Sequence, residues 1–168
     1  TTLPPGLELF LNMAPGQIAA DGIVEWLDEA IAKTGASSSR IFIEITETAA
    51  IADYRIGQRL EDLRARGLRI ALDDFGVGQS SLSALRSLPL DLMKVDRSFL
   101  VSADAEPRAR AVARLVCDLG RTLGVDVIAE GIETDDHLRL LTDIGCAMGQ
   151  GFLLGSPQPR ERALAYLP

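Results

Sequence analysis

The chain has 168 residues, of which 47% are hydrophobic and 24% are charged, and its formal net charge is -7. This length suits one domain with a substantial core, and no apolar run is long enough to span a bilayer. The acidic balance and the lack of a basic stripe argue against a DNA- or RNA-binding protein, but they allow an anionic small molecule held through metal ions. We therefore expect a cytoplasmic domain that makes no membrane contact itself, even if it belongs to a membrane-anchored receptor.

Two residue types are used sparingly. Cys117 and Cys146 lie in apolar contexts far apart in the sequence. This favours small buried side chains in a reducing compartment over a disulfide or a metal pair. Of the 17 basic residues only Lys33 and Lys94 are lysines, so a lysine at a special position is more informative here than in most chains.

Short apolar runs, most of which end in a polar or charged residue, recur along the chain. They predict strands at residues 7–13, 40–47, 90–96 and 125–131, and a weaker strand at 146–152. A further strand starts at Arg69 and continues into Asp73-Asp74-Phe75-Gly76-Val77-Gly78, after which Ser80 or Ser81 is the expected N-cap of a short helix.

Apolar residues at helical spacing predict a helix after each strand. Pro15 fits the opening of the first helix, Thr134 is expected to cap a later one that Gly145 closes, and a last helix is expected near Pro159. The expected buried faces are Ile23, Trp26, Leu27, Ala30 and Ile31; Ile56, Leu60 and Leu63; Leu82, Leu85 and Leu88; Val112, Leu115, Val116, Leu119 and Leu123; and Leu138, Leu141 and Ile144.

Strands that alternate with helices indicate a parallel α/β fold with right-handed crossovers. No G-x-G-x-x-G follows the first strand, which argues against a doubly wound dinucleotide-binding sheet. A complete barrel needs about 250 residues, and this chain supplies about six of the eight units. We predict a TIM-like (β/α)8 barrel that is N-terminally incomplete here, with residues 1–168 forming one domain that lacks its first strand and helix.

Polar side chains stand where the predicted strands end. They are Asn12, Glu44, Asp73 with Asp74, Lys94 with Asp96, Glu130, and Gln150. In a parallel α/β fold all of these ends open on one face, where catalytic residues gather. Each residue alone has an ordinary structural explanation, such as a helix cap, a turn or a backbone contact. The coincidence of six strand ends favours a functional site.

Asparagine and carboxylate oxygens suit hard ions such as Mg²⁺ or Mn²⁺, and the lack of a histidine near a strand end argues against zinc. His137, the only histidine, falls on a predicted helix and is expected at the surface or in packing. This many ligands favours two ions about 4 Å apart, the usual apparatus of phosphodiester hydrolysis. Asp73 is the candidate bridge and Asp74 a second ligand; alternatively, the two aspartates only begin a solvated loop.

Lys94 is the candidate catalytic residue. Beside metal ions and partly desolvated, its ammonium form would be disfavoured, so that it could orient or help deprotonate the attacking water, with Asp96 holding it by charge. The alternative is that Lys94 only neutralises surplus carboxylates. We expect Lys94→Ala to lower turnover by orders of magnitude while leaving fold stability near normal.

At these residues the chain resembles the EAL-domain family of bacterial cyclic di-GMP phosphodiesterases. The matching segments are Leu11-Asn12-Met13, Glu44-Ile45-Thr46-Glu47, Asp73 through Leu82, Lys94-Val95-Asp96, Ala129-Glu130-Gly131-Ile132-Glu133, and Gly145 through Gly151. The resemblance implies a (β/α)8-like barrel that opens cyclic di-GMP to linear pGpG with two Mg²⁺ or Mn²⁺ ions. It also implies a homodimer and attached sensory or diguanylate-cyclase domains.

The resemblance carries roles over by position. It implies metal ligands at Asn12, Glu44, Asp73, Asp74 and Glu130. It makes Lys94 the water-activating lysine, Asp96 its partner, Glu133 and Gln150 further active-site residues, Glu47 the anchor of the loop at 75–81, and Asn12, Asp73 and Gln150 substrate-binding residues.

The chain departs from the family pattern in two respects. The Glu-Ala-Leu motif, whose glutamate is a metal ligand in the family, and the substrate-contacting arginine after it are not in the sequence, so we expect little activity from these 168 residues alone. Val77 and Gln79 stand where threonine and tyrosine are common. The alternatives are an inactive member that senses cyclic di-GMP or binds a partner protein, and a different metal-dependent barrel enzyme.

Overall fold

The computed structural model describes residues 6–47, 54–77, 85–100 and 106–163. Six parallel strands pair in sequence order into one sheet. They are β1 Leu9–Asn12, β2 Ile41–Thr46, β3 Arg69–Phe75, β4 Leu92–Val95, β5 Asp126–Ala129 and β6 Met148–Gly149. A doubly wound sheet reverses its strand order at a switch point, whereas a barrel wall adds each strand beside the previous one. The sequential order confirms the barrel-type architecture, here an open half-barrel.

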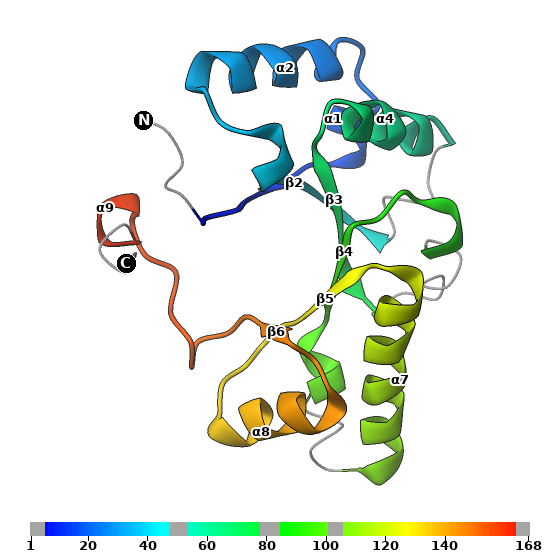
Figure 1. Cartoon of the computed structure of the whole chain (residues 1–168), viewed down its shortest axis with the longest axis vertical. Helices are drawn as coiled ribbons and strands as arrows, with labels where there is room; N and C mark the ends of the chain where they lie inside the picture. Colours follow the sequence, from blue (N-terminus) through cyan, green and yellow to red (C-terminus); the bar gives the residue numbers. More distant parts are fainter. Residues whose placement is uncertain (1–5, 48–53, 78–84, 101–105, 164–168) are drawn as a thin grey trace.

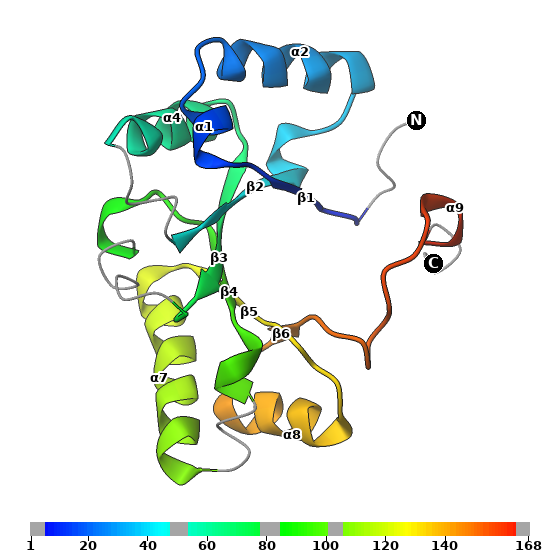
Figure 2. The same ribbon diagram turned by 180° about the vertical axis from the view of Figure 1, so that it is seen from behind.

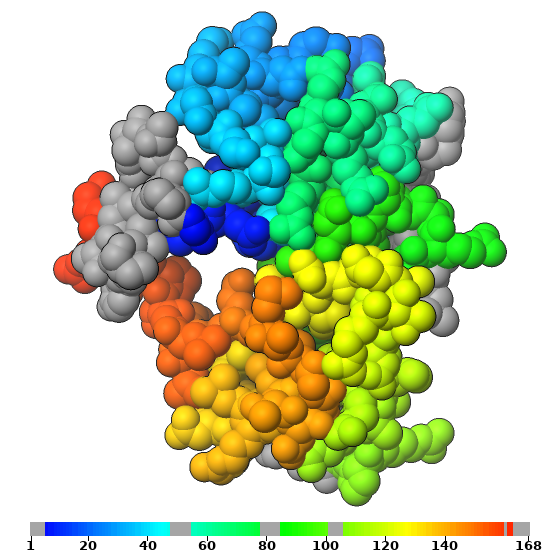
Figure 3. Space-filling view, viewed as in Figure 1, coloured from blue at the N-terminus to red at the C-terminus, as the bar shows by residue number. Residues whose placement is uncertain are grey.

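Helices lie on the outer side of this curved sheet. They are α1 Pro15–Ile18, α2 Ile23–Thr34, the 3-10 turn η1 Ser38–Arg40, α4 Tyr54–Ala65, α7 Pro107–Leu123 and α8 Asp135–Ile144. A last helix, α9 Arg160–Ala163, lies apart from this layer, on the open side of the half-barrel. Figures 1 and 2 show α2, α4, α7 and α8 arranged around the outside of the sheet. In the space-filling view of Figure 3 the molecule is hollowed where the segment at β1 (blue) faces the segment after β6 (orange).

The main core lies between the outer face of the sheet and these helices. Strand residues at alternate positions, such as Ile43, Ile70 and Leu72, are fully buried against Leu60 and Leu63 of α4. Alternation along each strand directs one set of side chains to the helices and leaves the other set on the concave face. The near-continuous apolar character of the strands follows from burial on both faces.

The concave face carries a second, smaller apolar cluster. Phe42, Ala71 and Leu92 are buried there, with Phe10 and Ile128 packed against them. The rings of Phe10 and Phe42 stack with centroids 4.5 Å apart. Two residues further along each of these five strands, on the same face, the sequence places Asn12, Glu44, Asp73, Lys94 and Glu130. Strand alternation therefore brings the predicted site residues to one side of the sheet.

An arginine braces the opposite end of the same face. The Arg69 guanidinium lies 4.2 Å from the centre of the Phe42 ring. It also forms ion pairs of 3.0 Å with Glu8, just before β1, and with Asp126, at the start of β5. Arg69 thus links β1, β3 and β5 at the end of the half-barrel opposite the predicted site.

Several residues predicted to begin or end helices are confirmed in these positions. The Thr134 hydroxyl accepts a hydrogen bond from the His137 backbone N–H at 3.2 Å and caps α8, and Gly145 ends that helix in the left-handed conformation. Pro107 begins α7. The predicted N-cap at Ser80 or Ser81, and Leu82 of the short helix, lie outside the described residues.

The prediction that Trp26 packs in the core is wrong. Trp26 is 63% exposed, and α2 buries Val24 and Leu27 instead. The helix lies at the edge of the sheet, beside α4, and covers little strand surface. The part of α2 that is buried is therefore narrower than the apolar face that its sequence predicts.

The predicted buried face of α7 is also largely wrong. Val112, Leu115 and Leu123 are 46%, 65% and 49% exposed, whereas the helix buries the residues Ala113, Val116, Cys117 and Gly120. Small side chains let α7 approach β5 closely, and periodicity weighted toward large apolar residues overlooks such a face.

Gly120 marks the closest approach of α7 to the sheet. A Cβ at this position would collide with the Val127 side chain and lie 2.9 Å from the Val125 carbonyl oxygen. Replacing glycine by alanine in a helix gains about 1 kcal/mol of propensity, but overpacking costs about 1–3 kcal/mol. We expect Gly120→Ala to lower the free energy of urea unfolding by up to about 2 kcal/mol, the difference between these two effects.

Gly57 in α4 is the matched control, because no atom lies within 4 Å of a Cβ built there. We expect Gly57→Ala to raise the free energy of unfolding by about 0.5–1 kcal/mol. A stabilising Gly120→Ala would show that the contact between α7 and β5 is looser than described.

The two cysteines are free and buried, as predicted. Both lie in the cluster beneath β5, where the Cys146 thiol donates a hydrogen bond to the Met148 carbonyl oxygen at 3.3 Å. The interaction between the two thiols raises the pKa of Cys117 and lowers the pKa of Cys146 to about 7. Among the described residues, no helix is both long and apolar enough to cross a membrane.

Candidate metal centre

A buried lysine holds three carboxylates together at the carboxyl ends of the strands. The Lys94 Nζ atom lies 2.9 Å from Glu44 Oε1, 3.2 Å from Asp73 Oδ1 and 2.6 Å from Glu130 Oε1. Lys94 is 8% exposed and Glu44 is 4% exposed. Four neighbouring strands thus bring one ammonium group and three carboxylates into contact, as the strand-end pattern predicts.

An irregularity in β3 brings adjacent aspartates to the same place. The pairing of β3 with β4 shifts register between Leu72 and Phe75, and Asp74 has a φ of +56°, which is rare for a residue other than glycine. A regular strand would direct Asp73 and Asp74 to opposite faces. The irregularity overcomes this alternation, as bulges near active sites often do.

Asp73, Asp74 and Glu130 form an acidic cluster. One ligand oxygen from each residue can be chosen so that all three lie within 4.8 Å of one another. In addition, Glu44 Oε1 and Asp73 Oδ1 are shielded from solvent, and apart from the Lys94 ammonium no donor among the described residues reaches them. Carboxylate oxygens in this arrangement fit a hard divalent cation.

The acidic cluster is electrostatically unfavourable without a counter-charge. Burial, followed by the charges of Asp73 and Asp96, raises the pKa of Asp74. Burial also raises the pKa of Glu130, against the opposing effect of Lys94, and the charges of Asp73 and Asp74 add to the shift. A bound cation would relieve this repulsion, so these carboxylates suit a divalent cation by their electrostatics as well as by the chemistry of their oxygens.

The expectation that the Lys94 ammonium is disfavoured is not met by the protein groups around it. Burial lowers the pKa of Lys94, but hydrogen bonds to Glu130 and Glu44 and the charge of Asp73 outweigh burial and raise the pKa above its ordinary value. Lys94 is therefore a firmly charged hydrogen-bond donor. Because it is the counter-charge of buried carboxylates, its removal will also affect stability.

The ion pairs that Lys94 forms in the described part of the chain do not include Asp96, its predicted partner. Asp96 Oδ1 accepts a hydrogen bond of 2.9 Å from the Ser98 backbone N–H, at the start of the helical turn at residues 97–100. The Ser98 side chain is the largest influence that lowers the pKa of Asp96; the backbone N–H groups of Ser98 and Arg97 add to it, and together they outweigh the opposing effect of burial. Glu44, Asp73 and Glu130 perform the role expected of Asp96.

The remaining predicted residues stand around this centre. Asn12 ends β1 beside Glu44 in the strand register, and Gln150 follows β6 with an exposed side chain. Glu133 forms an ion pair of 3.2 Å with Arg97, a residue that the sequence analysis did not single out. Its position directly after the Lys94-Val95-Asp96 segment could have indicated from the sequence that Arg97 lies near the site.

Two further predictions concern neighbouring residues. Glu47 is 3% exposed, but most of the loop that it was predicted to anchor lies outside the described residues. His137 is buried, and its Nδ1 atom accepts a hydrogen bond from the Glu133 backbone N–H at 3.3 Å. This confirms a packing role for the histidine.

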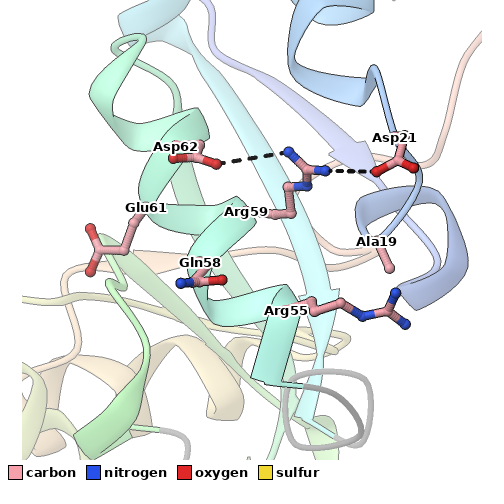
Figure 4. A pocket seen from close by; sticks show the side chains of 7 residues that line it. All are labelled: Ala19, Asp21, Arg55, Gln58, Arg59, Glu61 and Asp62. Atoms are coloured by element: carbon pink, nitrogen blue, oxygen red, sulfur yellow. Dashed lines mark hydrogen bonds and ion pairs between the residues drawn. The ribbon is translucent and has the colours of Figure 1, made fainter.

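A pocket of about 520 Å³ lies elsewhere, between α1 and α4 (Figure 4). Arg59 lies between Asp21 and Asp62 there, at 3.1 Å and 3.9 Å. The ion pair with Asp21 ties the connection between α1 and α2 to α4, whereas Asp62 lies one turn along the same helix as Arg59. None of the predicted site residues lines this pocket.

Comparison with known proteins connects this geometry to signalling proteins. The chain is 42% identical over 154 residues to an uncharacterized signaling protein of Caulobacter vibrioides, with 91% of this chain and 19% of that protein covered. It is 38% identical to the bifunctional diguanylate cyclase/cyclic di-GMP phosphodiesterase MucR of Pseudomonas aeruginosa, with 92% and 23% covered. It is 34% identical to the cyclic di-GMP phosphodiesterase RocR of the same organism, with 95% and 41% covered. The chain thus spans less than half the length of each.

Solved structures share the fold. The MucR phosphodiesterase in complex with c-di-GMP matches with a TM-score of 0.84 at 36% identity over 93% of this chain and 64% of that one. The EAL domain of Mycobacterium smegmatis DcpA matches with a TM-score of 0.90 at 35% identity over 95% and 72%. Klebsiella pneumoniae BlrP1, solved with c-di-GMP and either manganese or calcium, matches at 32% identity over 87% and 38%, with TM-scores of 0.83 and 0.82.

The family model for the EAL domain matches residues 2–157, which include every strand and the whole acidic cluster. The structures with similar folds include EAL domains, and the match to the DcpA EAL domain extends over most of this chain and most of that one. On this match the chain belongs to the EAL domain family.

Proposed function

We propose that this domain hydrolyses cyclic di-GMP to linear pGpG with the help of two divalent cations. The observation that carries the proposal is the convergence of Glu44, Asp73 and Glu130 on Lys94, with Asp74 completing an acidic cluster. Support comes from MucR and RocR, which are named as cyclic di-GMP phosphodiesterases. Water adds to phosphorus and the bond to the 3′ oxygen breaks, which leaves a 5′ phosphate and a free 3′ hydroxyl.

Five residues would hold the cations. Asp73, Asp74 and Glu130 form the acidic cluster, Glu44 lies against Lys94, and Asn12 neighbours Glu44 in the register of β1 and β2. We propose Mg²⁺ or Mn²⁺ as the ions, with Asp73 as the bridging ligand, because Asp73 belongs to the acidic cluster and also contacts Lys94, which lies against Glu44. Divalent cations at such a site polarise the phosphodiester and lower the pKa of a bound water.

The other side chains bind and orient. A charged Lys94 would orient the attacking water as a hydrogen-bond donor and balance negative charge that develops at phosphorus. We propose that Asn12, Asp73 and Gln150 contact the substrate, and that Asp96 and Glu133 are further active-site residues, with Asp96 acting through the turn at 97–100 and not through Lys94. Glu47 remains the proposed anchor of the loop at 75–81.

The direct test incubates the intact protein with cyclic di-GMP and Mg²⁺ or Mn²⁺ and follows pGpG by chromatography. Formation of pGpG that stops when EDTA is added supports the proposal. Binding of cyclic di-GMP without cleavage would indicate a sensor instead. If the protein neither binds nor cleaves cyclic di-GMP, the proposed substrate is contradicted, and a different metal-dependent enzyme becomes the better interpretation. We further propose that the domain works beside sensory or diguanylate-cyclase domains, as the name of MucR suggests for that relative.

We also propose that two copies pair through α7. Val112, Leu115 and Leu123 are exposed along one stripe of this helix, beside a pocket lined in part by Phe99 and Ala109. A continuous apolar stripe on a surface helix is a typical contact face, and a symmetric dimer would cover the same stripe on both copies. We expect Leu115→Asp to shift the protein from dimer to monomer in light scattering.

Trp26→Asp is the matched control, because Trp26 is as exposed as Leu115 but lies on α2. It should leave the mass unchanged. A monomeric wild-type protein, or a Leu115→Asp variant that stays dimeric, would contradict pairing through α7.

A further inference from the structure

The rim of the acidic site carries an exposed cation. Arg97 follows Asp96 directly, and its side chain is 62% exposed. Its backbone packs against Gly131, which has a φ of +74° and follows Glu130; a Cβ at Gly131 would collide with the Arg97 side chain. This close approach places Arg97 beside the carboxyl end of β5, next to a residue of the acidic cluster.

The surroundings of Arg97 are strongly negative. Asp73, Asp74, Asp96 and Glu130 influence one another through their charges. The buried Lys94 ammonium is occupied by three carboxylates. An anionic dinucleotide that approaches this rim is repelled by the carboxylates, and a cation at the rim reduces that repulsion beyond what cations bound in the acidic cluster supply.

The partner of Arg97 can be exchanged easily. The guanidinium lies 3.2 Å from Glu133 Oε1, and the two side chains are 62% and 43% exposed. An exposed pair of this kind contributes little net stability, whereas a guanidinium binds phosphate oxygens through a planar fork of donors. A phosphodiester can therefore replace Glu133 as the partner of Arg97 at small cost.

We propose that Arg97 binds a phosphodiester group of the substrate, and that Glu133 holds the guanidinium at the rim until the substrate arrives. The inference rests on the proposed function, since it takes cyclic di-GMP as the ligand of this site. Arg97 then sets the affinity for the dinucleotide, while the acidic cluster sets the affinity for cations.

Arg97→Ala tests this division in the intact protein. Titration calorimetry measures the Kd of cyclic di-GMP in Ca²⁺, the ion present with the dinucleotide in one BlrP1 structure, and separately the Kd of Ca²⁺ alone. We expect the dinucleotide Kd to rise about tenfold or more and its salt dependence to weaken, with the Ca²⁺ affinity unchanged. Arg97→Lys should recover part of the affinity, because it retains the charge without the fork.

Arg110→Ala is the control, since Arg110 forms a similarly exposed ion pair of 2.8 Å with Asp143 away from the predicted site residues. It should change neither Kd. Wild-type affinity in Arg97→Ala would overturn this inference alone, and so would an equal loss of Ca²⁺ and dinucleotide binding, because Arg97 would then act through the acidic cluster. Failure of the wild-type protein to bind cyclic di-GMP would overturn the proposed function, and this inference with it.

Discussion

Lys94→Ala is expected to lower the rate of pGpG formation by about a hundredfold or more, the range that a positioned proton donor or acceptor contributes. It is also expected to destabilise the metal-free protein by about 3 kcal/mol, because removing one partner leaves buried carboxylates without a counter-charge. From the sequence alone we expect near-normal stability, but the contacts of Lys94 Nζ with Glu44, Asp73 and Glu130 make a loss of stability the expected result. Initial rates and urea unfolding in EDTA measure the two effects.

Mn²⁺ separates the two roles of Lys94. A cation bound to the acidic cluster supplies counter-charge, so we expect Mn²⁺ to restore much of the stability of Lys94→Ala without restoring its turnover. Lys33, the only other lysine, provides the control, since it forms an exposed ion pair with Glu29 at 3.2 Å. Lys33→Ala should change stability by less than about 0.5 kcal/mol. Wild-type turnover in Lys94→Ala would show that the lysine takes no part in the reaction.

Asp73→Asn is expected to remove most of the stabilisation by Mn²⁺ and to lower turnover by about two orders of magnitude. A ligand present at a hundred times its Kd stabilises a folded protein by about 2.7 kcal/mol. The wild-type protein should show this increase in thermal or urea unfolding, whereas the variant, at the same Mn²⁺ concentration, should show little. The reason is that Asp73 belongs to the acidic cluster and also contacts Lys94.

Asp126→Asn is the matched control for this variant. Asp126 lies on the same face of the sheet, at the opposite end of β5, where it pairs with Arg69. It should leave the response to Mn²⁺ and the turnover unchanged. A full response in Asp73→Asn would place the cation elsewhere and would contradict the bridging role.

Much of the fold could be predicted because its signals are local. Apolar runs that end in carboxylates, and helices bounded by residues such as Thr134 and Gly145, indicated parallel strands with crossovers, and the strand order confirms the barrel. The buried face of α7 could not be predicted in the same way. It consists mainly of small residues, and its depth depends on the approach of Gly120 to Val125 and Val127, which only the packed structure reveals.

The site shows the same division. That Glu44, Asp73, Lys94 and Glu130 meet followed from strand alternation alone. The charge state of Lys94 did not, because it depends on the distances to three partners. Nor did the partner of Asp96, since the nearby Ser98 backbone N–H competes for the carboxylate. Contacts between strands follow from register, whereas hydrogen bonds within a turn depend on backbone geometry that the sequence leaves open.

The left-handed backbone of Asp74 has a consequence for the chain as a whole. Glycine adopts this conformation without penalty, and removing the carboxylate would also relieve the burial of charge and the repulsion by Asp73 and Asp96 that raise the pKa of Asp74. A glycine in place of Asp74 would therefore stabilise the fold but weaken the binding of cations. The folded half-barrel tolerates local conformational strain so that two consecutive acids can serve a single site.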